Sequence, residues 1–429
     1  MRREENDLLT QTSAGTPGGD LLRRYWQPVF LSAELKTDTP EPVEIMGEKL
    51  VLFRDESGHA ALLGTLCPHR CADLSYGRVE DNGIRCLYHG WLFDRHGHCL
   101  DQPAEPVEST YKNEIRHTAY PCHEAAGAIF AYMGPGEPPP FPNFHFMSAP
   151  EDHVFQNKIF HACNYLQGNE GNMDPSHLSF LHANSLPRGG KAASEGELHK
   201  VVHRTIFEDQ RPSLQVEKTR YGIRIFAERK KGEGKKLVRI TNFVFPNFGF
   251  FSGEDQRYGE GGYSVHWHVP INDTSHWRFD FCYHSKEKLD KEHMLMRIKQ
   301  ELGENHVPRR SAANRYLQDR EQMKGKSYAG LGAYFAAHDL FAVESAGPIH
   351  DRTREYLGQA DVAIVASRRM LLDAMKNMKD GKPLPFTLEK PEDNRFNDIL
   401  VISAEMGEDE DPRGFCRTVT ESGDFHAIK

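Results

Sequence analysis

Two short loops of the sequence each carry one cysteine and one histidine at a spacing that could bind metal. The first holds Cys67 and His69 with one residue between them; the second, after sixteen further residues, holds Cys86 and His89 with two between them. Zinc fingers usually place both cysteines in one loop and both histidines in the other. A mixed pair of loops instead suits two unlike irons, one bound by two thiolates and the other by two imidazoles. The spacing therefore predicts an iron–sulfur cluster.

This ligand set is that of a Rieske [2Fe-2S] centre, and the neighbouring residues agree with it. Because imidazole is neutral and thiolate is charged, the two histidines raise the reduction potential above that of an all-cysteine, plant-type cluster. Pro68 stiffens the first loop, Gly90 allows close approach of the backbone, and Trp91 offers an apolar wall. A structural zinc site or two unrelated Cys/His loops is the alternative. Cys71 is expected to be a small buried residue rather than a further ligand.

A second group of polar residues, Asp174, His177 and His182, lies about a hundred residues downstream. On an ideal helix, histidines five positions apart lie roughly 140° apart around the axis, so one metal could bind both only at a distorted segment or a helix end. The H-E-x-x-H spacing of zinc proteases is absent. Two such histidines and a carboxylate from elsewhere would bind a mononuclear iron and leave positions open for O₂. The competing interpretation is an Asp174 helix cap, with Pro175 first in the helix, beside ordinary histidines.

The elements around these residues change character along the chain. Short apolar runs broken by Gly, Pro, Asn and Asp predict a small all-β unit over residues 40–155, with a Pro-rich exit at 133–146. Residues 157–182 are expected to be helical in part, and alternation returns over 200–285, including a hairpin that turns at 232–234. In the strand predicted at 275–284, aromatic residues share one face and Arg278, Asp280, Cys282 and His284 share the other. A core-facing helix is expected near 364–378.

Composition restricts the class of protein. The 429 residues and 48.9 kDa suggest two domains, and a net charge of −9 with pI near 6.2 argues against nucleic acid or an anionic membrane as the main partner. No apolar run approaches the ~20 residues of a membrane span, and the charged N-terminus does not read as a signal peptide. Eight cysteines are too few for a disulfide scaffold. A cytoplasmic protein is expected.

Several longer stretches resemble one family, the catalytic α subunits of the Rieske non-haem iron oxygenases, and within it the phthalate 4,5-dioxygenase and dehydrodivanillate O-demethylase group. The resemblance runs nearly end to end, through "GTPGGDLLRRYWQPVFLSAEL", "RCLYHGWLFD", "NYLQGNEGNMDPSHLSFLH" and "VESAGPIHDRTREYLGQADVAIVASRRMLLDA". One departure is Cys71, which stands where such relatives commonly have glycine after "CPHR".

The resemblance implies roles for the polar residues. Cys67, His69, Cys86 and His89 would bind the cluster, His177 and His182 the iron, and Asp174 would bridge an iron histidine to a cluster histidine across a subunit boundary. The third iron ligand would be a downstream acid. Asp339 is chosen because members of the family place the ligand aspartate just before a helix that carries a glutamate a turn or so later. Glu344 is the second candidate, Asp351 a distant third, and a helix cap is the plain alternative for Asp339.

The resemblance also implies an α+β fold: a Rieske domain at 40–155 and a helix-grip (Bet v1/START-like) catalytic domain at 156–429, with an N-terminal helix within 1–39 packed on it. The expected cofactors are the Rieske cluster and mononuclear Fe(II). The sequence lacks a convincing dinucleotide fingerprint and a second cysteine cluster, so NADH would act only through a separate flavin and iron–sulfur reductase. A homotrimer, alone or stacked as a hexamer, is expected.

The expected activity is the hydroxylation of an aromatic acid with O₂, as a phthalate- or benzoate-like ring dihydroxylation. Monooxygenation or O-demethylation of a methoxylated acid stays open, as do a Rieske electron carrier without oxygenase activity and a zinc-stabilised interaction module. Arg224 and Arg239, both in expected strands, are candidates to bind the substrate carboxylate, although exposed strand arginines are the plainer interpretation. The small, polar loop at 181–200 could cover the substrate as a lid.

Overall fold

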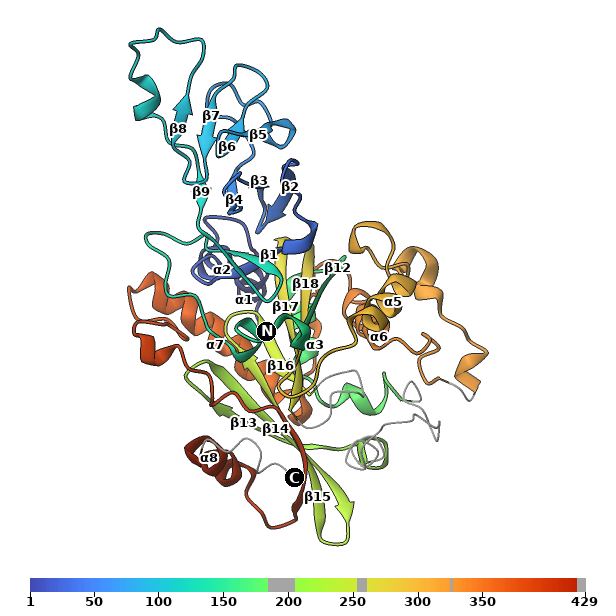
Figure 1. Ribbon diagram of the computed structural model, residues 1–429. Helices are drawn as coiled ribbons and strands as arrows, with labels where there is room; N and C mark the ends of the chain where they lie inside the picture. Colours follow the sequence, from blue (N-terminus) through green and yellow to red (C-terminus); the bar gives the residue numbers. More distant parts are fainter. Residues whose placement is uncertain (184–204, 253–260, 325–326, 423–429) are drawn as a thin grey trace. The chain divides into compact units, whose positions relative to one another are not determined.

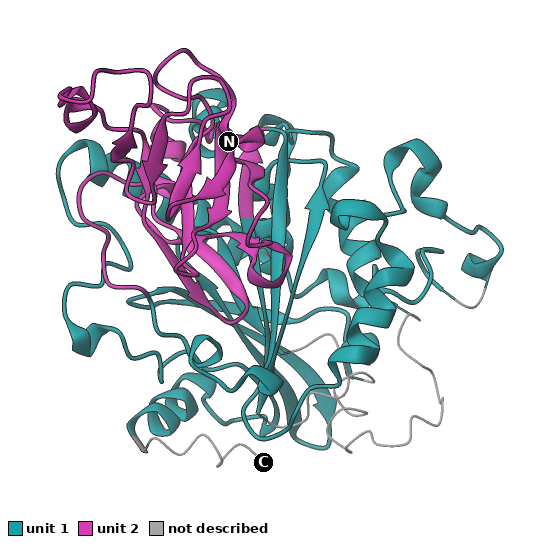
Figure 2. Ribbon diagram, turned by 45° about the horizontal axis from the view of Figure 1, so that its top comes forward, with its two compact units in different colours: residues 1–10, 142–268, 274–429 teal, residues 11–141, 269–273 magenta. Residues whose placement is uncertain are grey.

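The computed structural model describes residues 1–183, 205–252, 261–324 and 327–422. The chain divides into two compact units, coloured separately in Figure 2. The N-terminal unit comprises residues 11–141 and 269–273, and the C-terminal unit comprises residues 1–10, 142–268 and 274–429. Most of the loop expected as a lid, from residue 184 to residue 200, lies outside the described residues.

The N-terminal unit consists mainly of short antiparallel strands, arranged in three sheets with the orders β1-β11-β10, β2-β3-β4-β9 and β5-β6-β7-β8. Its elements are α2 (Pro17–Leu22), β1 (Gln27–Leu31), β2 (Glu41–Ile45), β3 (Glu48–Arg54), β4 (Ala60–Gly64), β5 (Arg78–Glu80), β6 (Gly83–Arg85), β7 (Leu92–Asp94), β8 (Cys99–Asp101), β9 (Ala119–Tyr120), β10 (Cys122–Ala125) and β11 (Ala128–Ala131).

The apolar core of this unit includes two of the predicted cluster ligands. Cys67 and Cys86 are buried in the same cluster of side chains as Trp91 and Phe93, together with residues of β3 and β4. The core therefore fixes the positions of both cysteine-bearing loops.

The C-terminal unit is built on one antiparallel sheet of eight strands, seven of them in the order β12-β18-β17-β16-β15-β14-β13, with β19 paired to the free part of β15 (Figure 1). The strands are β12 (Val154–His161), β13 (Ser213–Lys218), β14 (Gly222–Gly232), β15 (Lys235–Val244), β16 (Phe248–Phe251), β17 (Gly262–Asn272, whose last residues belong to the N-terminal unit), β18 (Ser275–His284) and β19 (Ile402–Gly407).

Helices cover both faces of this sheet. They are α1 (Arg3–Thr10), α3 (Tyr165–Asn172), α5 (Lys291–Glu301), α6 (Phe335–Glu344), α7 (Val362–Lys379) and α8 (Pro412–Ser422). The long α7 lies against β13 and β14, and Ser367, Leu371 and Met375 on it are buried, as the periodic pattern predicts.

The pairing of the strands assigns their side chains to two faces, because directly opposed residues point to the same side of a sheet. Phe226, Val238 and Ile240 pack against Cys416 and Val419 of α8 and define one face. The opposite face carries charged and polar side chains. The register follows this face across the sheet. Arg239 of β15 pairs with Ala227 of β14, and Gly249 of β16 pairs with Phe243 of β15 and with His266 of β17; at the far edge, Asn157 of β12 pairs with Asp280 of β18. We call this second side of the sheet the polar face.

The helices α3 and α6 lie over the polar face. Asn172 at the end of α3 hydrogen-bonds the Nε2 atom of His268, and Ala336 of α6 packs on Ile159 of β12. Gly168 of α3 is required for this close packing, since a Cβ atom there would collide with His268.

The predicted α+β class is confirmed, and so are the hairpin of β14 and β15 and the helix α7. The partial helix expected over 157–182 is α3, whereas residues 157–161 belong to β12 and pair with β18. The domain limits at 40 and 155 stay a prediction; in the structure residues 11–39 group with the N-terminal unit, since β1 pairs with β11. Among the described residues, no helix is both long and apolar enough to cross a bilayer.

Candidate metal centres

The two Cys/His loops of the N-terminal unit have the same backbone geometry. The amide of Cys71 donates to the carbonyl of Cys67 at 2.8 Å, and the amide of Gly90 donates to that of Cys86 at 3.0 Å. Each donor lies four residues after its cysteine and has a positive φ, 57° at Cys71 and 78° at Gly90. Cys71 thus occupies a left-handed position that favours glycine. Its thiol is exposed, so the expectation of a buried side chain is wrong.

The loops bring their four potential ligands together with the cysteines inside and the histidines outside. Cys67 and Cys86 are 1% and 3% exposed, whereas His69 and His89 are half-buried. The two imidazole rings are 4.4 Å apart, and His69 stacks on Trp91 at 4.5 Å. Two thiols in the core and two imidazoles at the surface fit a cluster whose irons have unlike ligands.

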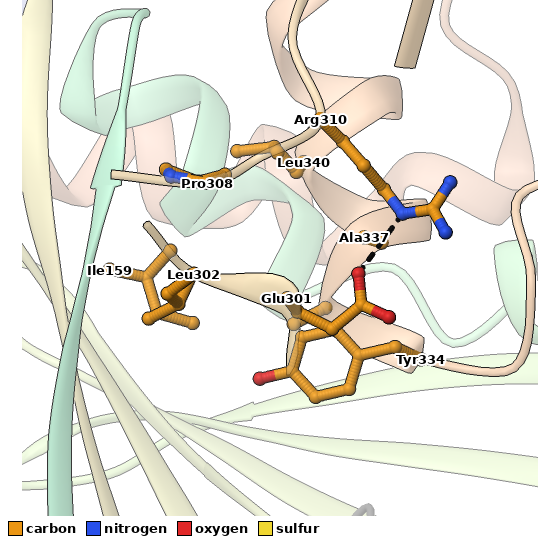
Figure 3. A pocket seen from close by; sticks show the side chains of 9 residues that line it. Ile159, Glu301, Leu302, Pro308, Arg310, Tyr334, Ala337 and Leu340 are labelled. Atoms are coloured by element: carbon orange, nitrogen blue, oxygen red, sulfur yellow. Dashed lines mark hydrogen bonds and ion pairs between the residues drawn. The ribbon is translucent and has the colours of Figure 1, made fainter. Parts of the chain in front are cut away.

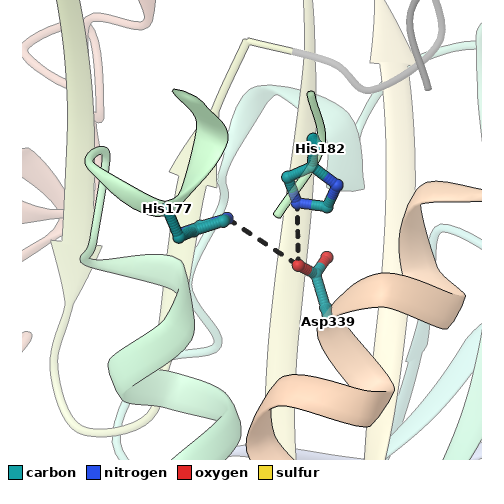
Figure 4. A group of neighbouring side chains, drawn as sticks. All are labelled: His177, His182 and Asp339. Carbon is teal, nitrogen blue, oxygen red and sulfur yellow. Dashed lines mark hydrogen bonds and ion pairs between the residues drawn. The ribbon is translucent and has the colours of Figure 1, made fainter. Parts of the chain in front are cut away.

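In the C-terminal unit, the structure brings His177, His182 and Asp339 together, with one ligand atom from each within 4.8 Å of the others (Figure 4). The Nε2 atoms of His177 and His182 lie 3.7 and 3.0 Å from the same oxygen, Oδ1 of Asp339. Burial alone would raise the pKa of the Asp339 carboxyl, but the two histidines and Arg278 lower it well below its usual range. Two imidazole nitrogens and one carboxylate oxygen on one side fit a mononuclear non-haem iron.

His177 and His182, which are five residues apart, can both face one metal because they lie beyond the end of the regular helix α3. α3 stops at Asn172, and His177 begins a short 3-10 turn (His177–Ser179). His182 is 1% exposed and lies beside two nearly parallel rings of α6, with the ring of Phe335 at 4.1 Å and that of His338 at 5.2 Å. The Nδ1 atom of His338 also faces the carbonyl of Leu181 at 3.1 Å, which ties α6 to this segment. No sequence motif marked His338 or Phe335.

Asp174 lies on the other side of His177 from Asp339. Its Oδ2 atom is 3.7 Å from Nδ1 of His177, and its Oδ1 accepts the amide of Ser176 at 2.7 Å. Asp174 thus contacts one nitrogen of His177 while the other faces Asp339, which is the geometry of a residue that orients a ligand.

The other two acids considered for the third ligand have different partners. Glu344 accepts the amide of Ala162 at 2.7 Å and the Tyr316 hydroxyl at 3.0 Å. Asp351 caps the turn at Thr353 and pairs with Arg3 at 2.9 Å. Neither belongs to the group formed with His177 and His182.

The strand register separates the two arginines proposed to bind substrate. Arg224 pairs with Asn242, away from the polar face, and is held by Glu217 at 3.1 Å and by the carbonyl of Asp398. Arg239 lies on the polar face; the pKa of His182 is lowered chiefly by burial, and the charge of Arg239 adds to this lowering. Burial lowers the pKa of Arg239 itself to about 10, which leaves the guanidinium charged at neutral pH. Its hydrogen bond is to the Ser252 hydroxyl, and its Nε atom has no partner among the described residues.

A small pocket lies against α6 (Figure 3). Ile159, Leu302, Pro308, Ala337 and Leu340 give it an apolar lining, and an ion pair of Arg310 with Glu301 at 3.0 Å stands at its edge. No predicted site residue lines it.

Comparison with known protein families matches both units. The model of the Rieske [2Fe-2S] domain covers residues 25–112, and the model described as LigXa C-terminal domain like covers residues 131–399. The phthalate 4,5-dioxygenase oxygenase subunit of Pseudomonas putida is 35% identical, over 93% of this chain and 92% of that protein. The chain belongs to the Rieske non-haem iron oxygenases.

Further relatives agree with this membership. The 5,5'-dehydrodivanillate O-demethylase oxygenase subunit of Sphingobium is 31% identical over 94% of this chain and 87% of its own length. The terminal oxygenase of carbazole 1,9a-dioxygenase from Novosphingobium has the same fold, with a TM-score of 0.55 at 20% identity, over 85% of this chain and 96% of that one.

As a Rieske oxygenase, the protein is an oxidoreductase and one component of a multicomponent system, in a family whose cofactors are a Rieske cluster and a mononuclear iron. Both donor sets described above fit these groups. The match over residues 131–399 is inconsistent with an electron carrier made of a Rieske domain alone. A zinc-stabilised module is excluded by the same family membership.

Proposed function

We propose that Cys67, His69, Cys86 and His89 hold the Rieske cluster, that His177, His182 and Asp339 hold Fe(II), and that the protein oxygenates an aromatic acid with O₂. The observation that carries the proposal is the convergence of two imidazole nitrogens on one Asp339 oxygen. When bound, the iron supplies O₂ activation with electrons delivered through the cluster.

The residues around the proposed iron site would fix the orientation of the two histidine ligands. Phe335 and His338 fix the ring plane of His182, and Asp174 fixes His177 through the nitrogen that does not face Asp339. His182 is almost completely buried, so its imidazole is held in a dry environment in which polar interactions are strong.

The electron supply extends beyond this chain. We propose a separate NADH-dependent reductase with flavin and iron–sulfur groups, and a cytoplasmic location where NADH is available. We further propose a homotrimer in which Asp174 links an iron histidine of one subunit to a cluster histidine, His69 or His89, of the next. A head-to-tail interface that closes on itself gives such a ring.

The substrate class follows from Arg239. Arg239 is half-buried and forms no ion pair with a carboxylate among the residues that the structure describes; a carboxylate is the natural counter-ion for a guanidinium. Arg229 adds a second guanidinium, a buried one, to the same face; burial lowers its pKa to about 10, and its Nη2 atom donates to the carbonyl of Pro175 at 2.7 Å. An aromatic acid with its carboxylate at Arg239 is therefore the proposed substrate, and Arg224 is not the anchor.

Ring dihydroxylation is the first candidate reaction, by analogy with the phthalate 4,5-dioxygenase subunit; O-demethylation is the second, since a demethylase subunit is nearly as similar. Turnover of phthalates, benzoates and methoxybenzoates under ¹⁸O₂, with reductase supplied, distinguishes them by mass spectrometry. A product with both labelled atoms indicates dihydroxylation, whereas formaldehyde and a free phenol indicate demethylation. No product from any acid, with both metal centres filled, would refute the proposed substrate class.

A further inference from the structure

A chain of hydrogen bonds runs along the polar face from Cys163 to His266. Nδ1 of His276 lies 2.7 Å from the carbonyl of Cys163, and its Nε2 lies 3.0 Å from Nδ1 of His268. Nε2 of His268 lies 3.0 Å from Nδ2 of Asn172, and Oδ1 of the same amide lies 3.3 Å from Nδ1 of His266. The three histidines are at most 5% exposed, so these contacts form in the interior.

The carbonyl of Cys163 fixes the direction of every hydrogen bond in this chain. A carbonyl only accepts, so Nδ1 of His276 carries the proton of that ring. Burial lowers the pKa of all three imidazoles, that of His276 to about 4, so each ring is neutral and has one N–H group. Nε2 of His276 therefore accepts from His268, and Nε2 of His268 accepts from the amide of Asn172. The amide oxygen of Asn172 then accepts the Nδ1–H of His266, which makes Nε2 of His266 the acceptor nitrogen of its ring.

A second acceptor atom faces this nitrogen. Oδ1 of Asp280 lies 3.6 Å from Nε2 of His266. The other carboxylate oxygen, Oδ2, accepts a hydrogen bond from Arg278 at 2.9 Å, whereas Oδ1 accepts none from the described residues, although Nε of Arg278 lies 2.8 Å away. Two lone pairs that face each other repel, and one proton between them converts the repulsion into a hydrogen bond. The geometry therefore calls for one proton beyond those of the neutral rings and an ionised carboxylate.

The charges around Asp280 favour retention of that proton. Burial raises the pKa of its carboxyl, and the carboxylate of Asp339 on α6 adds to this rise; Arg278 opposes the rise without cancelling it. On the neighbouring strand β12, the residue opposite Asp280 is the neutral Asn157. The influence of Asp339 also means that Asp280 lies within electrostatic reach of the proposed iron site.

The surroundings of His266 keep its ring neutral. Burial, Arg278 and His161 all lower its pKa, and the ring of Phe251 packs against it at 4.2 Å. The extra proton therefore resides chiefly on Asp280, which donates it to Nε2 of His266 in a hydrogen bond.

Both candidate reactions consume protons. Ring dihydroxylation and O-demethylation each take up one O₂, two electrons and two protons; the first adds two hydroxyl groups, and the second releases formaldehyde and one molecule of water. In a site from which water is excluded, a buried acid can hold such a proton ready. When the proton leaves Oδ1 of Asp280, a new O–H bond forms on the oxygen that receives it. Arg278 stabilises the remaining carboxylate, and solvent water restores the proton.

We infer that Asp280 and His266 share one proton and donate it in the reaction with O₂ at the iron site. The inference rests on the proposed function and adds a proton donor to it. The chain that ends at Cys163 keeps the ring of His266 in the one tautomer that can accept a hydrogen bond from Asp280.

Neutron diffraction locates the proton directly. Crystals of the protein with both metal centres filled are exchanged into D₂O at neutral pH. The expected map has one deuteron between Nε2 of His266 and Oδ1 of Asp280, bonded to either atom, and further deuterons on Nδ1 of His266, His268 and His276. If neither Nε2 nor Oδ1 carries a deuteron, only water joins the two side chains and the inference is refuted.

The Asp280→Asn variant tests the donation. Its amide can still donate to Nε2 of His266 and accept from Arg278, but it has no proton to release. Iron content is expected to be unchanged, and the affinity for a carboxylated aromatic compound to stay within about threefold of the wild type. Product formed per O₂ consumed is expected to fall at least about tenfold, with hydrogen peroxide accounting for the remaining O₂, because a positioned acid contributes roughly a hundredfold or more. Glu217→Gln, which removes a carboxylate from the opposite face of the sheet, is the control and should keep the wild-type ratio.

An Asp280→Asn protein that couples O₂ to product as well as the wild type does would overturn the donor role, even with the deuteron in place. If the variant does not fold, the neutron map of the wild type decides. A wild type that oxygenates no acid would refute the proposed function and the donor role with it, whereas the neutron map still decides whether the proton is shared.

Discussion

Asp174 places its Oδ2 atom 3.7 Å from Nδ1 of His177, the nitrogen that faces away from the rest of the triad. On the other side of the ring, Nε2 of His177 lies 3.7 Å from Asp339. The imidazole is therefore flanked by two carboxylates with different tasks. Asp339 can bind the same metal as His177, whereas Asp174 can only orient the imidazole ring.

The Asp174→Asn variant is expected to keep mononuclear iron and lose coupled turnover. The change preserves the shape of the side chain but removes the charge that orients His177 and, in the proposed trimer, joins two subunits. Iron content and product formed per O₂ consumed are the measurements. Asp339→Asn is the control that should lose iron. Equal loss of iron from both variants would mean that Asp174 is itself a ligand.

Glu344→Gln is expected to retain iron, unlike Asp339→Asn, although both acids lie on α6. The Glu344 carboxylate accepts hydrogen bonds from Ala162 and Tyr316, and weakening these bonds should lower the free energy of unfolding by about 1–3 kcal/mol. Metal analysis and denaturant unfolding check the two parts separately. An iron-free Glu344→Gln protein would reverse the choice of ligand.

Cys71→Gly is expected to stabilise the protein by up to about 1 kcal/mol, because it relieves a left-handed non-glycine residue. The matched change in the other loop, Gly90→Ala, should destabilise it, since φ is 78° and the added Cβ would lie 3.0 Å from Pro103. Chemical unfolding of cluster-loaded protein gives both values. Loss of the cluster in Cys71→Gly would instead reveal a role for the thiol.

Glu170 is expected to make stability depend on acid pH. It is buried and accepts hydrogen bonds from Arg352 at 2.8 Å and Arg368 at 2.6 Å. Burial acts to raise the pKa of Glu170, but the two arginines outweigh it and lower the pKa below 4.5. Its contribution is therefore full above pH 4.5 and is lost as the pH falls through the lower, folded-state pKa.

The Glu170→Gln variant should be about 3–5 kcal/mol less stable at pH 7, because it leaves buried arginine charge uncompensated. Its unfolding free energy should also fall less steeply than that of the wild type below pH 4.5. Denaturant titrations at several pH values make the comparison. Parallel curves for the two proteins would rule out Glu170 as the titrating group.

Arg239→Gln should weaken binding of a carboxylated aromatic compound by at least about tenfold, because a charged hydrogen bond contributes roughly 1.5–3 kcal/mol. Arg224→Gln, on the opposite face, should leave the affinity unchanged and lower stability instead. Calorimetric titration with one acid and its neutral amide measures both effects. Equal losses in the two variants would refute the assignment of the anchor.

The sequence was most informative where ligand type and spacing are local. Cys67, His69, Cys86 and His89 lie within two loops, so one stretch of chain defines the group. Asp339 depended on resemblance, because a residue so distant from His182 approaches it only through the packing of α6. The same packing explains why His338 and Phe335 were not found.

The faces of the sheet were only partly predictable. Alternation in β18 separated Arg278 and Asp280 from the aromatic residues, and the structure keeps that division. The relation of Arg224 to Arg239 required the register of β14 with β15, which a single sequence does not contain. Of the stretch 157–182, expected to be helical in part, α3 is the helical part and residues 157–161 are strand, since a short apolar run does not by itself distinguish helix from strand.

The most direct test of the account is the iron content of the protein, read together with the spectroscopic signal of its reduced Rieske cluster, in the wild type and in His182→Ala. The account predicts that the variant loses about one iron in three while the cluster signal is unchanged, since the cluster has its own four ligands. A wild type that holds only cluster iron, or a variant that retains all its iron, would contradict it.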